Sequence, residues 1–433
     1  RIGWPGLRGS GSSRQPNRLK SSPATSWMGG GIVNRRNPLW VIGLAVFLWG
    51  ACHSEPGSDP AYRHANEPIG NVRQVYDGRL LPDRQVNTFR NIDRLFPTRT
   101  VKRGERVYPL PEGERALADF SFESKGRTYD LYDFLSLNRV AGLIVIKGGE
   151  VVFEEYMLGN DAETRWMSMS VVKSITATLI GMAIRDGSIG SLDDPVTDYV
   201  EELKGSAYEG VTVRHLLQMS SGVDWNETYT DSTSDRRAML EAQIAQEPGG
   251  ILEVMAALDR AAPPGSRWNY STGETQVAGA LVAAATGKPV SDYLSEKIWS
   301  PLGMESDAEW WLESPEGLEI GGSGLSATLR DYARFGLFLL HEGRIEGRET
   351  LPEGWIESAS TAQRIGGEWV EYGYMLWPLS GGAYAAIGIF GQFVVVFPEQ
   401  DMVVAMWGAQ SKPEGSATVD EYDFFQALAR ALP

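Results

Sequence analysis

Two pairs of short apolar runs, one before the middle of the chain and one near its end, predict β-hairpins. In the first pair, runs at 141–146 and 151–156 flank a Gly-Gly turn. In the second pair, β-branched runs at 393–397 and 402–407 flank a Pro-Glu-Gln-Asp loop. Runs of β-branched and aromatic residues bounded by turn residues are typical of paired strands. We therefore expect sheet strands at both places.

Between these hairpins the apolar residues recur mostly at helical spacing, with glycine and proline as punctuation. Segments 214–219, 276–286, 291–299 and 327–341 each show it, and 420–432 has the pattern of an amphipathic helix. Strands near both ends with helices between them predict an α+β fold. We expect one antiparallel sheet formed by both ends of the chain, with flanking helices and a mostly helical insertion.

The first 52 residues differ in composition from the rest. They contain seven Lys and Arg residues and neither Asp nor Glu. Residues 1–27 are rich in Gly, Ser, Pro and Arg and lack methionine, so we expect an upstream, non-native segment there and a start at Met28. In 28–52, a short basic region precedes about a dozen apolar residues and Cys52, which is typical of a signal peptide.

The run that ends at Cys52 is also similar to a bacterial lipoprotein cleavage site, where the cysteine receives a lipid. Trp49 departs from this pattern, which prefers leucine there, and an N-terminal anchor helix is the alternative. We expect an exported bacterial protein, periplasmic or held at the membrane through lipidated Cys52. Residues 53–112 are polar and proline-rich, and we interpret them as an extended linker and N-terminal extension. The domain itself is expected at 113–433.

The overall composition is that of an ordinary globular protein, with 42% apolar and 22% charged residues. The net charge of −16 argues against nucleic-acid binding, which needs a positive surface. The single cysteine excludes an internal disulfide and a cysteine-based zinc site, and four histidines leave little for a His-rich metal centre. We therefore expect neither metal nor cofactor, and the oligomeric state stays open.

Candidate chemistry begins at Ser170-Val171-Val172-Lys173, at the start of a helix that is apolar almost all round. Residues three apart lie on the same helix face. A serine hydroxyl needs a base beside it to act as a nucleophile. Burial favours the neutral form of a lysine, which would make Lys173 such a base. A helix-capping serine beside a lysine that reaches to solvent is the alternative.

Two further segments have residues suited to the same chemistry. Tyr270 stands on a predicted loop before a helix, where a tyrosine can relay protons between a lysine and a leaving group, although a half-buried loop tyrosine is the commoner case. Gly388-Ile389-Phe390-Gly391-Gln392 opens a predicted strand, where glycine permits close approach of a ligand and a backbone N–H can stabilise an oxyanion. A simple edge strand with a bulge is the alternative there.

These three segments, in this order, resemble the serine β-lactamase and penicillin-binding-protein superfamily. The resemblance is closest to its class C-like branch, with the 6-aminohexanoate-dimer hydrolases and family VIII esterases, and covers about 120–432. It implies a β-lactamase/transpeptidase-like fold, with Ser170 as the acylated nucleophile, Lys173 as its proton acceptor and Tyr270 as the shared acid/base. The same alignment implies an oxyanion hole from the backbone N–H groups of Ser170 and Gln392.

The chain departs from the family pattern in two places. Thr272 stands where the family often has the asparagine of Y-x-N, and Ile389-Phe390-Gly391 stands where β-lactamases and D,D-peptidases have K-T-G. The missing lysine removes a cation that would bind a substrate carboxylate. We therefore expect hydrolysis of a small-molecule ester or amide with an uncharged end. A β-lactamase or D,D-peptidase-like enzyme is one alternative, and a non-catalytic envelope protein of the same fold is another.

Pocket candidates follow from the same segments. They are Thr272, Ile389, Phe390 and Gly391, together with two aromatic residues shortly before the last segment, Tyr374 and Trp377. Aromatic residues are as often part of the core as of a ligand site. His215 lies within a helical apolar pattern, and we interpret it as a structural hydrogen-bonding residue rather than a triad base.

Overall fold

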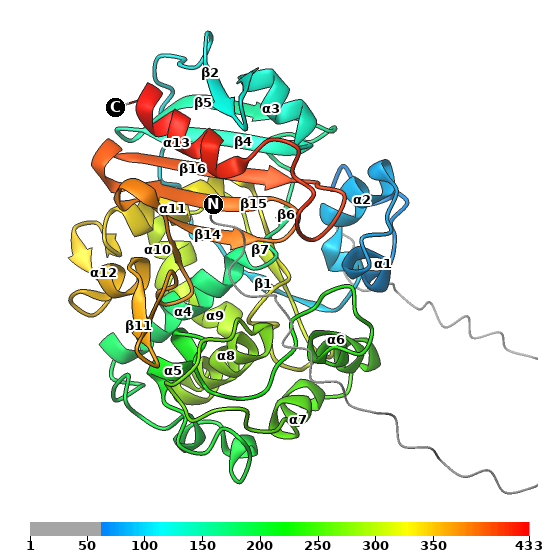
Figure 1. Cartoon of the computed structure of the whole chain (residues 1–433), viewed down its shortest axis with the longest axis vertical. Helices are drawn as coiled ribbons and strands as arrows, with labels where there is room; N and C mark the ends of the chain where they lie inside the picture. The colour runs from blue at the N-terminus through cyan, green and yellow to red at the C-terminus, as the bar shows by residue number, and fades with distance from the viewer. Residues whose placement is uncertain (1–61, 433) are drawn as a thin grey trace, which may run out of the picture. The chain divides into compact units, whose positions relative to one another are not determined.

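Six antiparallel strands form the central sheet, and segments from both ends of the chain contribute to it (Figure 1). The computed structural model describes residues 62–432, which lie within one unit, Pro56–Pro433. In spatial order the strands are β13 (Trp377–Pro378), β14 (Tyr384–Gly388), β15 (Gln392–Phe397), β16 (Met402–Gly408), β4 (Val140–Lys147) and β5 (Glu150–Tyr156). The predicted sheet built from both ends of the chain is confirmed.

The two predicted hairpins are the β4–β5 and β15–β16 pairs of this sheet. Gly148 and Gly149 both have positive φ, 58° and 80°, as the tightest hairpin turns require. The hairpins join through β16 and β4, where Val403 pairs with Ile146. All residues of β15 and β16 are buried, which explains their continuous apolar runs rather than an alternating pattern.

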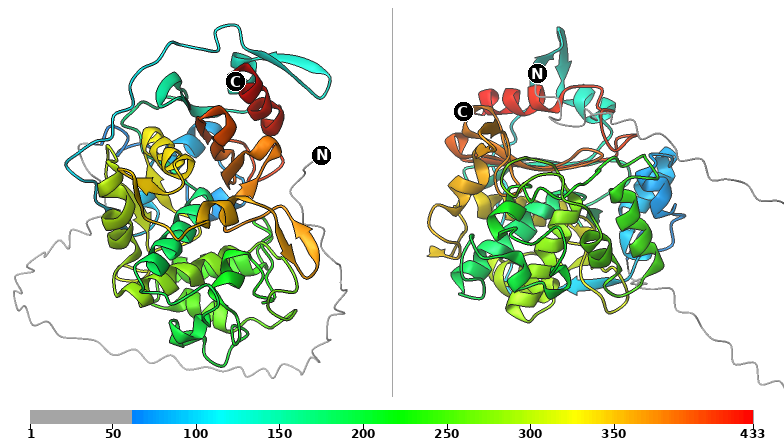
Figure 2. Two further views of the ribbon diagram at one scale, coloured as in Figure 1. Left: turned by 90° about the vertical axis from the view of Figure 1, so that its left-hand side faces the viewer. Right: turned by 60° about the horizontal axis from the view of Figure 1, so that its bottom comes forward.

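Helices cover both faces of the central sheet. On one side, α11 (Leu329–Leu340) packs on β15 and β16, and α4 (Val171–Arg185) packs on β14. Gly336 allows the close approach of α11, because a Cβ there would lie 2.4 Å from Val403. On the other side lie α13 (Glu421–Ala431) and α3 (Leu131–Leu137) (Figure 2). Helix α13 contacts β15 through Phe425 and Phe393, and the rings of Phe424 and Phe134 stack between α13 and α3.

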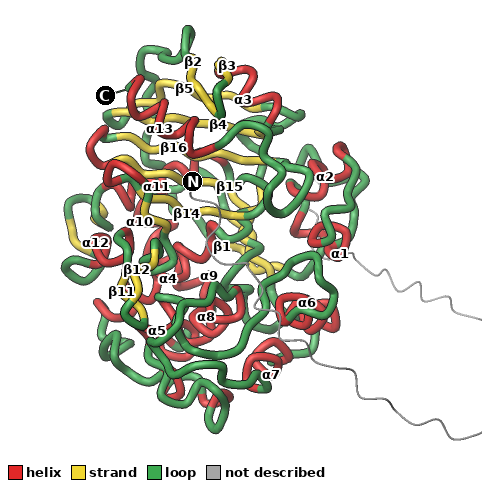
Figure 3. Tube along the Cα trace, viewed as in Figure 1, coloured by secondary structure: helices red, strands yellow, loops and turns green. Residues whose placement is uncertain are grey.

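The helical insertion lies between β5 and β14, and α4 and α8 pack against each other within it (Figure 3). Ser271 caps α8 by accepting from the N–H of Glu274, so the helix begins at Thr272, four residues before the predicted start. Besides α4 and α11, the α-helices between β5 and β14 are α5 (Val213–Leu217), α6 (Asp235–Ala245), α7 (Gly250–Ala256), α8 (Thr272–Thr286), α9 (Val290–Leu294), α10 (Ser300–Leu302) and α12 (Trp355–Ser360).

Smaller sheets complete the described chain. Four strands form a second antiparallel sheet, in the order β1 (Thr98–Val101), β7 (Ala308–Trp311), β8 (Leu325–Ala327) and β6 (Trp166–Met167). Three two-stranded pairs are β2 (Ser121–Ser124) with β3 (Arg127–Asp130), β9 (Arg344–Ile345) with β10 (Arg348–Glu349), and β11 (Gln363–Ile365) with β12 (Glu368–Val370).

Residues 62–112 lie on the domain, as an N-terminal extension should, but they are not simply extended. They form α1 (Val72–Tyr76), α2 (Pro82–Phe89) and β1, and Phe89 is buried in the same core as the central sheet. Proline-rich sequence predicts a loop, whereas Pro82 occupies the first turn of α2, where its missing N–H is tolerated. The predicted leader and Cys52 lie outside the described residues. Among the helices described, none is long and apolar enough to cross a membrane.

Candidate active site

The structure places Ser170 and Lys173 side by side at the N-terminal end of α4. Ser170 is the residue that precedes the first helical turn, and its side chain lies 3.2 Å from the lysine, measured from Oγ to Nζ. Met169, just before it, has a φ of 44°, a conformation that non-glycine residues rarely adopt. Such strained backbone is frequent at functional sites. The two side chains that the sequence paired are therefore hydrogen-bonded to each other.

Lys173 is fully buried, and three oxygen atoms surround its Nζ. Besides Ser170 Oγ, these are Thr272 Oγ1 at 2.9 Å and the carbonyl oxygen of Gly322 at 2.7 Å. The pKa of Lys173 is lowered to about 7, mainly by burial; Glu227 opposes this fall and Arg236 adds to it. As a neutral amine, Lys173 donates two protons and keeps one lone pair, which then faces the Ser170 hydroxyl.

Gly322 is suited to its place beside the lysine because it has no side chain. A Cβ there would lie 2.9 Å from Lys173 Nζ and 2.8 Å from Thr272 Cγ2. Any larger residue would push the lysine away from the backbone carbonyl that holds it.

Tyr270 reaches the same cluster from the segment before α8. Its ring centroid lies 5.5 Å from Lys173 Nζ, and the Ser170 side chain acts on its hydroxyl by lowering the pKa of Tyr270. Burial and the nearby Glu227 carboxylate raise the pKa of Tyr270 above its ordinary value. Tyr270 is therefore protonated at neutral pH and can donate a proton, while the lysine is the group that can accept one.

The turn between β14 and β15 also lies against the nucleophile. A Cβ on Gly388 would come within 3.0 Å of the Ser170 backbone nitrogen, so only glycine permits this approach. Gln392 pairs with Gly388 across the hairpin, and its side chain is fixed by Trp166 Nε1 at 3.0 Å and by the backbone of Gly408. The first residue of β15 is thus held beside Ser170, where the resemblance expects the second oxyanion donor.

Of the pocket candidates from the aromatic and glycine-containing segments, Trp377 lies beside Tyr270, whereas the others pack against residues elsewhere. Trp377 lies at the site, with its ring 5.9 Å from that of Tyr270. Tyr374 instead packs on Trp355 and accepts a hydrogen bond from Arg214. Ile389 and Phe390 are buried, and the Phe390 ring packs in the core against Phe89. Gly391, with a φ of 87°, lies against the side chain of Gln410.

Thr272 supports the lysine rather than lining an open pocket. Its side chain is buried, and its hydroxyl is hydrogen-bonded to both Lys173 and the carboxylate of Glu227. Glu227 was not among the candidate site residues predicted from the sequence. Glu227 stands in a loop 45 residues before Thr272. The nearest sequence signal is its place among polar turn residues, which does not distinguish it from other loop acids.

Other predicted features are explained by local structure. His215 Nδ1 accepts from the Thr212 backbone N–H and so caps α5, and burial lowers the pKa of His215. No group of three or more His, Cys, Asp or Glu residues in the described part of the chain could hold a metal ion.

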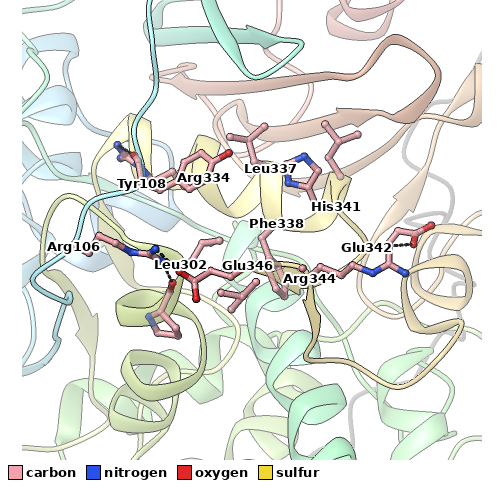
Figure 4. Close-up of a pocket in the computed structure, with 14 residues that line it drawn as sticks. Arg106, Tyr108, Leu302, Arg334, Leu337, Phe338, His341, Glu342, Arg344 and Glu346 are labelled. Carbon is pink, nitrogen blue, oxygen red and sulfur yellow. Dashed lines mark hydrogen bonds and ion pairs between the residues drawn. The ribbon is translucent and has the colours of Figure 1, made fainter.

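A cavity of about 690 Å³ lies elsewhere, between α11 and the segment that contains Arg106 and Tyr108 (Figure 4). Neither Ser170 nor Lys173 lines it. Arg106 pairs there with Glu346, and Arg344 pairs with Glu342.

Comparison with known proteins agrees with this geometry. Residues 138–429 match the family model described as Beta-lactamase. The 6-aminohexanoate-dimer hydrolase of Paenarthrobacter ureafaciens is 30% identical over 345 residues, which cover 75% of this chain and 86% of the relative. Esterase EstB of Burkholderia gladioli is 29% identical over 176 residues, or 37% of this chain and 44% of the esterase.

Solved structures show the same fold. A Bacillus anthracis protein named as a candidate 6-aminohexanoate-dimer hydrolase has a TM-score of 0.70 at 23% identity and covers 79% of this chain and 91% of its own. A family VIII carboxylesterase has a TM-score of 0.52 at 16% identity, over 67% of this chain and 92% of its own. The fold and the relatives are those of serine hydrolases. The chain belongs to the beta-lactamase family.

Proposed function

We propose that this protein hydrolyses a small-molecule ester or amide through an acyl-enzyme on Ser170. The observation that carries the proposal is the 3.2 Å contact between Ser170 Oγ and the buried Nζ of Lys173. In acylation, Lys173 takes the hydroxyl proton while Oγ bonds to the substrate carbonyl carbon. The backbone N–H groups of Ser170 and Gln392 stabilise the resulting oxyanion.

Collapse of this intermediate breaks the bond between the carbonyl carbon and the leaving oxygen or nitrogen. Tyr270, protonated at neutral pH and with its ring 5.5 Å from Lys173 Nζ, donates its proton to the leaving group. Lys173 then transfers the proton it took from Ser170 to the Tyr270 oxygen, so that both groups return to their starting protonation states. In deacylation, water gives a proton to the same base, attacks the acyl carbon and releases the acid, and Ser170 regains its proton.

The substrate class follows from the third segment and the relatives. The chain has Ile389-Phe390-Gly391 where a carboxylate-binding lysine would stand, which favours esters and amides with an uncharged end. The names of two relatives, a 6-aminohexanoate-dimer hydrolase and an esterase, fit the same bond types. We also propose export, with Cys52 as the lipid-bearing residue, from the basic and apolar pattern of 28–52.

The test is an assay of purified protein against a short-chain p-nitrophenyl ester, a 6-aminohexanoate dimer and nitrocefin, with Ser170→Ala in parallel. Turnover of the ester or the amide that is lost in the variant, with slow nitrocefin hydrolysis, supports ester or amide hydrolysis through Ser170. Because the linear dimer has a free carboxylate, a preference for the ester over the dimer is the result expected for a substrate with an uncharged end. Fast nitrocefin hydrolysis would instead assign a β-lactamase. Covalent labelling of Ser170 without turnover would favour a non-catalytic envelope protein.

A further inference from the structure

Glu227 and Thr272 form a hydrogen-bonded chain that ends at the base of the site. Lys173 Nζ donates to Thr272 Oγ1 at 2.9 Å, and Thr272 Oγ1 donates to Glu227 Oε1 at 2.5 Å. All three side chains are buried, with at most 3% of their surface exposed. We propose that Glu227 is a positioning residue that orients the Thr272 hydroxyl and, through it, the lone pair of Lys173. This proposal rests on the proposed function.

The number of available protons fixes the direction of each hydrogen bond in this chain. A threonine hydroxyl has one proton and can act as donor or acceptor. Because a carboxylate only accepts, the Thr272 proton is committed to Glu227, and the hydroxyl can only accept from Lys173. One N–H of the neutral lysine is then fixed on Thr272 and a second on the carbonyl of Gly322. The remaining lone pair faces Ser170, as proton abstraction requires.

Glu227 is itself held by groups that do not involve the lysine. Its Oε2 accepts from the Thr272 backbone N–H at 2.8 Å and from Trp225 Nε1 at 2.5 Å. These bonds fix the carboxylate at the start of α8 before any substrate binds. A carboxylate placed in this way orients the hydroxyl continuously, with no reorganisation during the reaction.

The same arrangement explains the departure at position 272. The oxygen of an asparagine carboxamide can only accept a hydrogen bond. A hydroxyl can donate or accept, so a neighbouring group must fix which of the two it does. The Thr272–Glu227 pair therefore acts as a composite acceptor for the lysine. The charged and titratable groups around Lys173 are Glu227, Arg236 and Tyr270, and Glu414 in turn faces Glu227.

A double-variant cycle on kcat for the ester tests the chain. We expect Glu227→Gln and Thr272→Val each to lower kcat by about tenfold or more, and the double variant to be no slower than Thr272→Val alone. Thr272→Ser, which keeps the hydroxyl, should recover most of the wild-type kcat. Independent roles would make the two losses multiply, and an unchanged kcat in Glu227→Gln would equally overturn the proposal.

A second measurement does not need turnover. With ε-13C-labelled lysine, the Lys173 signal, identified by its loss in Lys173→Arg, reports the pKa of this amine directly. We expect Glu227→Gln to lower that pKa by about one unit, because an opposite charge nearby favours the protonated form. An unchanged titration would contradict the link between Glu227 and Lys173. Ser170→Ala assayed alongside shows separately whether the proposed nucleophile is wrong.

Discussion

The Nζ atom of Lys173 lies 3.2 Å from the Oγ atom of Ser170, one turn along the same helix. Two properties of α4 produce this relationship. The spacing of three residues puts both side chains on one face, and burial of nearly the whole helix deprives the lysine of water. A side chain that is ordinarily charged can thereby be neutral near pH 7, as the proposed role of Lys173 as a base requires.

The pH dependence of turnover should report the base. Because the pKa of Lys173 is lowered to about 7 and only the neutral amine accepts a proton, kcat/KM should rise with pH through about 7. Stopped-flow or initial-rate assays of ester hydrolysis from pH 5 to 9 measure this limb. Lys173→Arg, which stays protonated, should lose nearly all activity over the whole range. A flat profile for the wild type would count against lysine as the base.

Arg236 should set the position of that limb. Its positive charge is one of the causes that lower the pKa of Lys173, and its guanidinium lies over the Tyr76 ring at 4.3 Å. Arg236→Gln should therefore raise the pKa of Lys173 and move the acid limb to higher pH, by about half a unit or more. Arg236→Lys, which keeps the charge, is the control. A shift to lower pH in Arg236→Gln would show that the electrostatic assignment is reversed.

The buried lysine should cost stability, and the cost should depend on pH. The folded-state pKa of Lys173 is below that of the unfolded chain, so the penalty is complete below pH 7 and disappears as the pH rises toward 10. Lys173→Met should be inactive yet more stable by roughly 2–5 kcal/mol at pH 6. Denaturant unfolding at pH 6 and 9 measures the difference, which should shrink at pH 9. Equal gains at both values would contradict the lowered pKa.

Glu274 should produce the opposite trend. It is fully buried in the first turn of α8, where Ser221 donates to one oxygen, and burial raises its pKa to about 8. Its unfolded form ionises near the ordinary value, so wild-type stability should fall as the pH rises from about 4.5 to about 8. Glu274→Gln should remove this fall, with the largest gain in unfolding free energy above pH 8. As a control, Glu357→Gln at an exposed position on α12 should leave the unfolding free energy unchanged. A similar gain from Glu357→Gln would show that burial of Glu274 is not the cause of the effect.

The parts that sequence could predict are those with a local pattern. Apolar runs and turn residues predicted the two hairpins. The spacing of Ser170 and Lys173 within one helix predicted that their side chains lie together. Tyr270 was a candidate from its place on a loop before a helix, but its expected role as the shared acid/base came from the resemblance, because nothing local distinguishes such a tyrosine from other loop tyrosines. Glu227 was missed because its role exists only where a distant loop folds against the start of α8.

The N-terminal extension shows a different limit. Prolines between residues 53 and 112 indicated an extended segment, but Pro82 begins a helix and Phe89 enters the core against Phe390. Proline breaks a helix only beyond its first turn, so position within an element decides its meaning. The same contact shows why Phe390, expected at the pocket, packs in the core instead.

The most direct test of the account is the mass of the enzyme during turnover. After a rapid acid quench with a p-nitrophenyl ester, intact-mass and peptide analysis should find the acyl group on the peptide that contains Ser170. The adduct should be absent in Ser170→Ala and should form far more slowly in Lys173→Arg. An acyl group on another residue, or undiminished turnover by Ser170→Ala, would contradict the central claim that Ser170 is the nucleophile activated by Lys173.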